Sequence, residues 1–282
     1  MQPEAFFLPA KNGQRFCLFH PAHGQTTRGL VLYIHPFAEE MNKARRMAAL
    51  QSRALAKAGY AVLQMDLLGC GDSSGDFGDA NWQIWVEDIV HACHWLRGHA
   101  RLPKAEMEAA PLWLWGLRAG CLLSVSAAKQ LGTACNFLFW QPPPSGKVLL
   151  QQFLRLKVAG DMLNGKSKEA LETLRRKISN GTPMEVAGYM LSAELAMGLE
   201  QAELAPPPAN GGPSRLEWLE IISQENTCAS AIGKQKILQW RQSGYGVNSH
   251  TVHGPAFWQS SESVDAPALI AATTAALTPP GV

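Results

Sequence analysis

The sequence predicts an α/β fold in which most strands of one sheet run parallel. Continuous apolar runs rich in branched side chains, of which residues 29–35 are the clearest, are typical of strands covered on both faces. Segments with helical periodicity lie between these runs, so we expect strand–helix–strand crossovers that join parallel neighbours. Two shorter strand-like runs, residues 4–9 and 14–20, are separated by Asn12-Gly13, a pair that favours a tight antiparallel turn. The sheet is therefore expected to begin with an antiparallel hairpin.

Strands and helices alternate along the first half of the chain. The expected strands are residues 29–35, 61–66, 112–115 and 136–141, and the helices between them are residues 41–58, 82–96 and 121–131. Gly59 is a suitable stop for the first helix, because glycine readily adopts the left-handed conformation that ends many helices. Pro142, Pro143 and Pro144 follow the last of these strands and cannot continue a sheet, since proline has no amide hydrogen.

The segment after this proline run differs from the alternating part. Residues 145–202 show helical patterns, at 148–163, 168–178 and 184–199, and no strand signal. The proline- and glycine-rich stretch 205–213 predicts a flexible link. Strands and helices then alternate again at residues 216–222, 229–243, 246–252 and 264–277. We therefore predict a core at 1–144 and 214–282, with a helical cap and link at 145–213 inserted between its two parts.

Composition excludes several classes of protein. The 282 residues suffice for one large α/β domain with an insertion, and the formal charge of +2, with signs interspersed, argues against nucleic acid or an anionic membrane as partner. No apolar run approaches the roughly 20 residues needed to span a bilayer, and the N-terminus does not resemble a signal peptide, so we expect a cytoplasmic protein without a membrane span.

The sequence also indicates neither a metal nor another cofactor. The cysteines are scattered and form no Cys-x-x-Cys pair, which argues against a zinc site or a disulfide framework. Histidines and carboxylates do not cluster at metal-ligand spacing, and Gly69, Gly71 and Gly75 do not match a dinucleotide-binding fingerprint. We therefore expect the chemistry of any site to come from side chains and backbone alone.

One turn combines a familiar form with an unusual residue. The strand from residue 112 runs into Gly116-Leu-Arg-Ala-Gly120, and a helix is expected directly after it. A turn of the form glycine-x-nucleophile-x-glycine holds a reactive side chain on a strained bend between a strand and a helix. Arg118 is at the tip of this turn, and its guanidinium stays protonated at any working pH and cannot attack a carbonyl. The turn therefore predicts the architecture of an enzyme without its usual nucleophile.

The element order resembles the α/β-hydrolase fold over nearly the whole chain. The loop at residues 66–75 resembles the loop after the second parallel strand in many such enzymes, and His35-Pro36-Phe37 resembles their oxyanion loop. Four motifs, at residues 35–42, 116–120, 140–143 and 254–258, more narrowly resemble the exosortase A system-associated hydrolases of the second ortholog type. That family is found alongside bacterial exopolysaccharide and protein-sorting functions, and the resemblance implies no particular substrate.

The resemblance assigns roles to three residues. Arg118 takes the nucleophile position, Glu225 fits the acid position after the strand 216–222, and His253 fits the base position after the strand 246–252. A serine hydrolase needs a base within hydrogen-bond reach of its hydroxyl and an acid that orients the base. The acid and base positions are thus occupied, whereas the attacking group is missing.

The same resemblance places the oxyanion donors at the backbone amides of Phe37 and Ala119, since Pro36 has no amide hydrogen. With the N-terminus of the following helix and the fork of Arg118, these amides would form a pocket for a carboxylate or phosphate. His35 is expected to brace this loop.

For two residues, the sequence leaves an alternative role open. In the structural alternative, Arg118 forms an internal ion pair with Glu225, Glu39 or Glu40. Cys121 is the thiol nearest the turn, but its place on the helix should point it away from the tip.

Two functions are compatible with these residues. The first is a hydrolase of acyl esters or thioesters that uses His253 and Glu225 with water or another nucleophile. The second is a non-catalytic protein in which Arg118 anchors an anionic acyl ligand, alone or on an acyl-carrier partner, beneath the cap. The apolar residues of the cap mostly predict packing, but such side chains also line acyl pockets.

Overall fold

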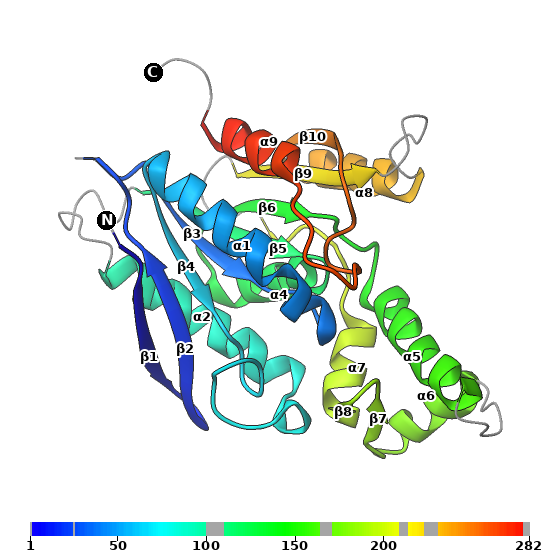
Figure 1. Ribbon diagram of the computed structural model, residues 1–282. Coiled ribbons are helices and arrows are strands. Elements are labelled where there is room, and N and C mark those ends of the chain that lie inside the picture. The colour runs from blue at the N-terminus through cyan, green and yellow to red at the C-terminus, as the bar shows by residue number, and fades with distance from the viewer. Residues whose placement is uncertain are drawn as a thin grey trace.

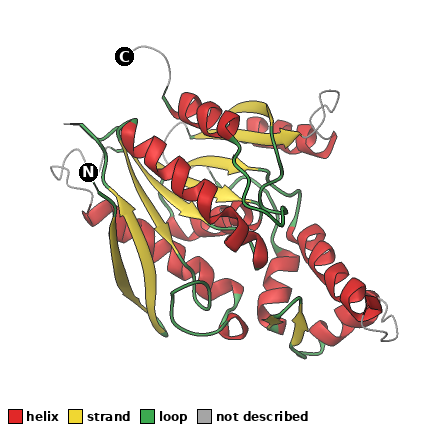
Figure 2. Cartoon of the chain, viewed as in Figure 1, coloured by secondary structure: helices red, strands yellow, loops and turns green. Residues whose placement is uncertain are grey.

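The computed structural model describes residues 2–24, 26–99, 110–163, 171–208, 214–222 and 231–278. Its centre is an eight-stranded sheet in the order β1-β2-β4-β3-β5-β6-β9-β10, with helices on both faces (Figures 1 and 2). The strands are β1 Glu4–Ala10, β2 Gly13–His20, β3 Gly29–Ile34, β4 Tyr60–Met65, β5 Leu112–Leu117, β6 Asn136–Trp140, β9 Arg215–Ile222 and β10 Gly246–His253. β2 runs antiparallel to β1 and β4, and the other neighbours pair in parallel, as predicted.

Helices cover each face because the central strands are apolar on both sides. The helices flanking the sheet are α1 Glu39–Lys57, α2 Trp82–His99, α4 Ala119–Leu131, α8 Ala231–Gln242 and α9 Pro267–Leu277. α2, α4 and α8 pack with one set of alternate strand residues, such as Leu114, and α1 and α9 pack with the other set, such as Trp115. The continuous apolar runs thus reflect burial on two faces. None of the described helices is both long and apolar enough to cross a membrane.

The segment between β6 and β9 lies beside the sheet rather than in it (Figure 1). Its described elements are α5 Gly146–Leu163, α6 Leu171–Ser179, β7 Met184–Val186, β8 Tyr189–Leu191 and α7 Ala193–Gln201. The predicted helix over 184–199 is therefore wrong in its first half, where β7 and β8 form an antiparallel hairpin. Ala187 and Gly188 connect the two strands with φ angles of 50° and 83°, which a tight turn between twisted strands requires.

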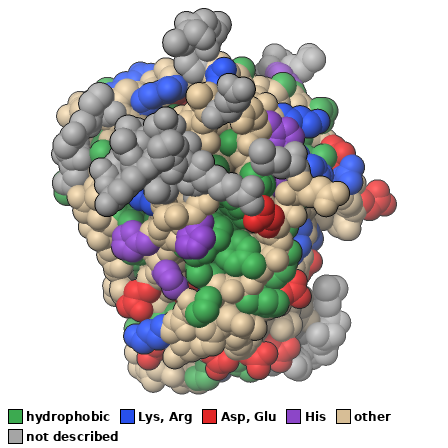
Figure 3. Space-filling view, turned by 90° about the vertical axis from the view of Figure 1, so that its left-hand side faces the viewer, with side chains coloured by type: hydrophobic (Ala, Val, Ile, Leu, Met, Phe, Trp, Pro, Cys, Tyr) green, Lys and Arg blue, Asp and Glu red, His purple; other side chains and the backbone are tan. Residues whose placement is uncertain are grey.

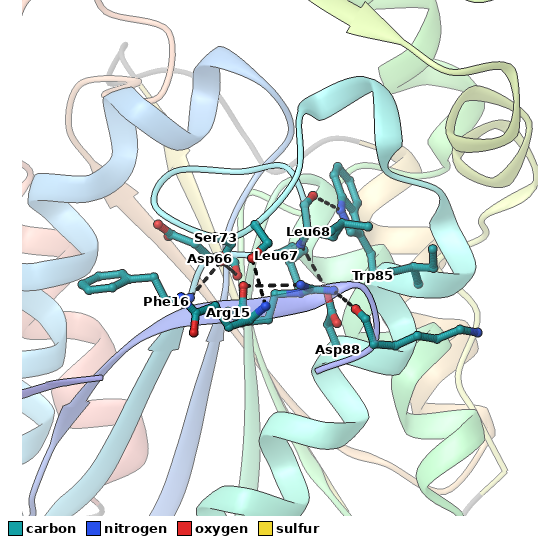
Figure 4. A network of polar contacts seen from close by, with 12 residues as sticks. Arg15, Phe16, Asp66, Leu67, Leu68, Ser73, Trp85 and Asp88 are labelled. Carbon is teal, nitrogen blue, oxygen red and sulfur yellow. Dashed lines mark hydrogen bonds and ion pairs between the residues drawn. The ribbon is translucent and has the colours of Figure 1, made fainter. Parts of the chain in front are cut away.

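A buried polar network fixes the loop that follows β4 (Figure 4). Arg15 Nε on β2 donates to Asp88 Oδ2 on α2 at 2.7 Å, and both side chains are almost fully buried. The same carboxylate oxygen accepts the backbone N–H of Leu68 at 3.1 Å. In the same loop, Ser73 Oγ accepts the backbone N–H of Phe16 at 2.9 Å. The loop is thereby tied to β2 and α2 together.

The charge pattern of the surface agrees with the small net charge. On the face drawn in Figure 3, acidic and basic side chains are interspersed among polar and apolar ones, and neither sign covers the face.

Candidate active site

The turn between β5 and α4 has the strained form that the glycine pattern predicts. Arg118 has a φ of 55° and a ψ of −114°, a conformation that costs a non-glycine residue about 1–3 kcal/mol and persists only when the surroundings enforce it. A Cβ atom on Gly116 would lie 2.5 Å from the amide nitrogen of Cys121, and one on Gly120 would lie 2.1 Å from the carbonyl oxygen of Ile34. Both glycines are therefore required for strand and helix to pack this closely.

Arg118 contacts one residue of α1 and one of α5. Its Nε donates to Glu40 Oε1 at 3.3 Å and to Glu40 Oε2 at 3.5 Å, and its Nη2 donates to Gln152 Oε1 at 2.8 Å. Of the ion-pair partners that the sequence left open, Glu40 makes the contact and Glu39 does not. Glu225, the third candidate, lies outside the described residues.

These residues line a cavity of about 480 Å³ between the sheet and the inserted segment. Its described walls come from α1 and the loop before it, from the turn at residues 116–120, called the elbow below, from α5, from the β7-β8 turn and from the loop after β10. The lining residues are Phe37, Ala38, Glu39, Glu40, Lys43, Arg118, Leu149, Gln152, Phe153, Leu156, Ala187, Trp258 and Gln259. None of them carries a hydroxyl, thiol or imidazole, so the described lining lacks the serine, cysteine and histidine groups of a hydrolytic triad.

The loop after β3 has a second strained residue beside the predicted oxyanion donors. Ala38 has a φ of 49° and a ψ of −129°, and the carbonyl of Phe37 accepts the N–H of Glu40 at 3.2 Å. The close approach of Gly120 to the end of β3 brings this loop against the N-terminus of α4. Within the described part of the chain, the amides of Phe37 and Ala119 make no hydrogen bond, so both remain available as donors.

His35 braces two loops and does not line the cavity. Its Nδ1 lies 2.8 Å from the carbonyl oxygen of Pro36, and its Nε2 accepts the N–H of Leu67 at 3.2 Å. These contacts assign the proton to Nδ1. Burial lowers the pKa of His35, so the ring stays neutral and joins the loop after β3 to the loop after β4.

Glu39 connects α1 to the inserted segment. Its Oε2 accepts the hydroxyl of Tyr189 at 2.8 Å and the amide of Asn42 at 3.1 Å. These two hydrogen bonds, that of Tyr189 first, lower the pKa of the Glu39 carboxyl. Glu39 therefore supports the cavity by holding β8 near α1 and not by pairing with Arg118.

The structure does not bring the predicted base to this cavity. His253 is the last residue of β10, is exposed and pairs in register with Ile222, and it is not among the described lining residues. The acid position, Glu225, falls in the stretch 223–230, outside the described residues. The acid and base roles of these two residues therefore stay predictions.

Cys121 is unsuited to nucleophilic attack. It is fully buried on α4, and its thiol donates to the carbonyl of Gly116 at 3.2 Å. Burial raises the pKa of the Cys121 thiol well above its usual range, so the reactive thiolate is not populated.

Sequence reasoning missed Gln152 as a partner of Arg118. The signal was present in α5, where Leu149, Phe153 and Leu156 recur at helical spacing and face the cavity. Gln152 lies on that same face, three residues after Leu149. A polar residue within an apolar stripe suggests a buried polar partner, although the sequence could not show which one.

Comparisons with known proteins identify the fold. No curated protein matches the chain. Residues 16–148, just under half of the 282 residues, match the family described as X-Pro dipeptidyl-peptidase (S15 family). Est1E from Butyrivibrio proteoclasticus with ferulic acid bound is similar at 14% identity with a TM-score of 0.66, over 97% of this chain and 96% of that one. A soluble variant of monoglyceride lipase from Saccharomyces cerevisiae is similar at 14% identity with a TM-score of 0.59, over 98% of this chain and 95% of that one.

A third similar structure is an α/β serine hydrolase without a lid from Xanthomonas campestris, at 14% identity and a TM-score of 0.53, over 100% of this chain and 97% of that one. With the sheet order, these likenesses show that the protein has the α/β-hydrolase fold, as predicted. At such identities they show the fold alone. The narrower resemblance to the exosortase-associated hydrolases stays a prediction.

Proposed function

We propose that the protein binds an acyl carboxylate in the elbow cavity, with Arg118 as the anchor of the carboxylate. The observation that carries this proposal is the place of Arg118 at the tip of the strained elbow, where it lines a cavity whose described walls hold no serine, cysteine or histidine. An arginine fork suits planar, bidentate recognition of a carboxylate. The backbone of Arg118 is strained although an arginine cannot act as a nucleophile, and strain of this kind usually accompanies a function such as binding.

The residues that line the cavity are partly charged and partly apolar. Arg118, the amides of Phe37 and Ala119 and the N-terminus of α4 all favour negative charge. Leu149, Phe153, Leu156 and Trp258 provide apolar surface for a hydrocarbon tail. The volume of about 480 Å³ lies within the range of roughly 300–1,000 Å³ typical of small-molecule sites. An amphipathic monocarboxylate satisfies both parts.

In this proposal the inserted segment, 145–213 with its link, acts as a cap over the core. Three contacts of this segment with the core support the role. Arg118 Nη2 donates to Gln152 Oε1, and the hydroxyl of Tyr189 donates to Glu39. Ser192 Oγ donates to the carbonyl of Ala80 at 2.6 Å. A cap held this way leaves the cavity bounded by both parts of the chain.

A second candidate function is hydrolysis of an acyl ester or thioester. It is favoured by the strained elbow and by the amides of Phe37 and Ala119, which make no hydrogen bond within the described residues and would serve as oxyanion donors. His253 and Glu225 would then serve as base and acid. The similar structures include a monoglyceride lipase, which supports ester hydrolysis for a protein of this fold, whereas Arg118 at the tip of the elbow argues against it. A cytoplasmic location, an exosortase-linked role and an acyl-carrier partner would fit either candidate.

Thermal unfolding with and without fatty acids tests the binding proposal. Octanoate, decanoate and laurate should raise the unfolding temperature, because a ligand at about 100 times its Kd stabilises the folded state by about 2.7 kcal/mol. Arg118→Met should remove most of this effect, and 1-decanol should not reproduce it. Arg46→Met is the matched control, since Arg46 pairs with Asp265 outside the cavity and should leave ligand binding unchanged. Equal stabilisation of wild type and Arg118→Met, or none by any of the acids, would reject the proposal.

A further inference from the structure

The contact between Arg118 and Glu40 is loose compared with other arginine–carboxylate pairs of the chain. Glu40 accepts only from Nε, at 3.3 and 3.5 Å. Arg15 reaches its aspartate at 2.7 Å, and Arg46 makes two bonds at 2.7 and 2.8 Å. Charge-assisted N–H to carboxylate bonds are usually about 2.7–2.9 Å long. The Glu40 carboxylate therefore contacts the guanidinium through Nε alone and does not form a bidentate pair with two of its nitrogens.

Much of the guanidinium is left for another acceptor. Gln152 accepts from Nη2, and Nη1 makes no hydrogen bond to another residue of the described ranges. A free carboxylate could accept two parallel N–H groups from one edge of this fork, which is stronger than a single long contact. A ligand carboxylate therefore has a geometric advantage over Glu40 at Arg118.

Two carboxylates beside one guanidinium repel each other, which favours the protonated form of one of them. The described cations near Glu40 are Arg118 from the elbow and Lys43 from the same helix, both of which lower its pKa. The neighbouring carboxylate, Glu39, is held by Tyr189 and Asn42. The other described cavity residues, from the loop before α1, from α5, from the β7-β8 turn and from the loop after β10, are Phe37, Ala38, Leu149, Gln152, Phe153, Leu156, Ala187, Trp258 and Gln259, and none of them titrates.

We infer that Glu40 is the resident occupant of the carboxylate subsite and that a ligand carboxylate replaces it at Arg118 while one proton moves from solvent onto Glu40. This inference rests on the proposed function. The exchange balances in charge, because one anion and one proton enter together and the cavity keeps its net charge. Burial already raises the pKa of the Glu40 carboxyl above its ordinary value, despite the opposing effect of Arg118, so the carboxyl is prepared to take that proton.

The exchange also narrows the class of ligand. A monocarboxylate needs one proton to balance it, and Glu40 can supply that balance. A phosphate monoester would bring a further negative charge, and the other described acid of the cavity, Glu39, is exposed and already engaged by Tyr189 and Asn42. The subsite should therefore prefer a fatty acid to an alkyl phosphate with the same chain.

Calorimetric titration of decanoate between about pH 6 and 8, in phosphate and in Tris, tests the exchange. The buffers differ in ionisation enthalpy, so the difference in measured heat counts the protons taken up. Binding raises the pKa of Glu40, so the complex is favoured at low pH, and the Kd should rise up to tenfold for each pH unit above the pKa of free Glu40. Glu40→Gln should bind with a Kd independent of pH and without proton uptake. Glu87→Gln is the matched control, because Glu87 pairs with Lys11 outside the described cavity lining, and it should keep both the slope and the uptake.

The outcomes separate this inference from the proposed function. Decanoate binding that depends on Arg118 but shows no proton uptake in wild type would overturn the exchange and leave the binding function in place. No decanoate binding by wild type at any of these pH values would reject both. The buffer comparison needs only wild-type protein, so it decides the matter even where Glu40→Gln does not fold. Tighter binding of decyl phosphate than of decanoate would contradict the preference for a monocarboxylate.

Discussion

Replacing Asp88 by leucine should destabilise the protein strongly, and replacing Arg15 as well should restore part of the loss. The two side chains form an ion pair of 2.7 Å in which Arg15 is 0% and Asp88 3% exposed. A buried charge whose partner has been removed costs about 3–5 kcal/mol. Asp88→Leu should cost at least this much, because it also removes the acceptor of the Leu68 amide, worth about 1–3 kcal/mol when left unpaired.

The double variant Arg15→Met, Asp88→Leu contains no buried charge. Its remaining losses are the acceptor for the Leu68 amide and the donors for the carbonyls of Lys11 and Gln14, which Arg15 Nη2 and Nη1 reach at 2.7 and 3.4 Å. Burial raises the pKa of Asp88 even with Arg15 beside it, which indicates that desolvation offsets most of the attraction within the pair. The double variant should therefore be more stable than Asp88→Leu alone.

Urea unfolding of wild type, both single variants and the double variant gives four free energies of unfolding. Together they form a double-mutant cycle that measures the coupling between Arg15 and Asp88. Glu87→Gln is the control, because the Lys11–Glu87 pair is exposed and 3.6 Å long and should contribute less than about 1 kcal/mol. A double variant whose loss equals the sum of the two single losses would show that the buried pair is not coupled, and the reasoning would be refuted.

Two further predictions concern other parts of the sheet. Gly120→Ala should destabilise the protein by about 1–3 kcal/mol or prevent folding, because its methyl group would meet the carbonyl of Ile34 at 2.1 Å; a wild-type urea midpoint would contradict this. Glu217 is buried, yet hydrogen bonds from His250, Asn248 and Arg215 outweigh that burial and lower its pKa. Its stabilising effect should be present above about pH 4.5 and be lost as the pH falls through the lower folded pKa, so the stabilities of wild type and Glu217→Gln should converge in acid; a gap independent of pH would refute it.

The sheet could be predicted because its physical causes are local. β3 and β5 are buried on both faces, so each of them is a continuous apolar run in the sequence. Asn12-Gly13, with φ angles of 62° and 108°, sets the first hairpin through turn chemistry alone. Such signals need no knowledge of tertiary contacts.

The β7-β8 hairpin could not be predicted for the opposite reason. Each of its strands has only three residues, too few to establish an alternating pattern against a helical one. Its turn begins with Ala187, which adopts a positive φ of 50° although alanine gives no turn signal. Tertiary packing against the core therefore determines this conformation.

The partner of Arg118 depends on the register of α1. The helix was expected from residue 41 but begins at Glu39, so Glu39 and Glu40 are both in its first turn. Consecutive helical residues point about 100° apart, and this rotation alone decides that Glu40 meets the elbow while Glu39 meets Tyr189. A difference of two residues lies within the ordinary uncertainty of a helix boundary, so the sequence could name the candidates and not choose between them.

The central claim, that Arg118 anchors a carboxylate where related folds carry out hydrolysis, is tested most directly by one paired measurement. Wild type, Arg118→Met and His253→Ala are each titrated with decanoate and assayed for hydrolysis of the nitrophenyl ester of decanoate. The account predicts that wild type binds decanoate without turning over the ester, that Arg118→Met loses binding and that His253→Ala keeps it. Wild-type hydrolysis that His253→Ala abolishes would contradict the account and establish an enzyme whose attacking group is not the residue at the elbow tip.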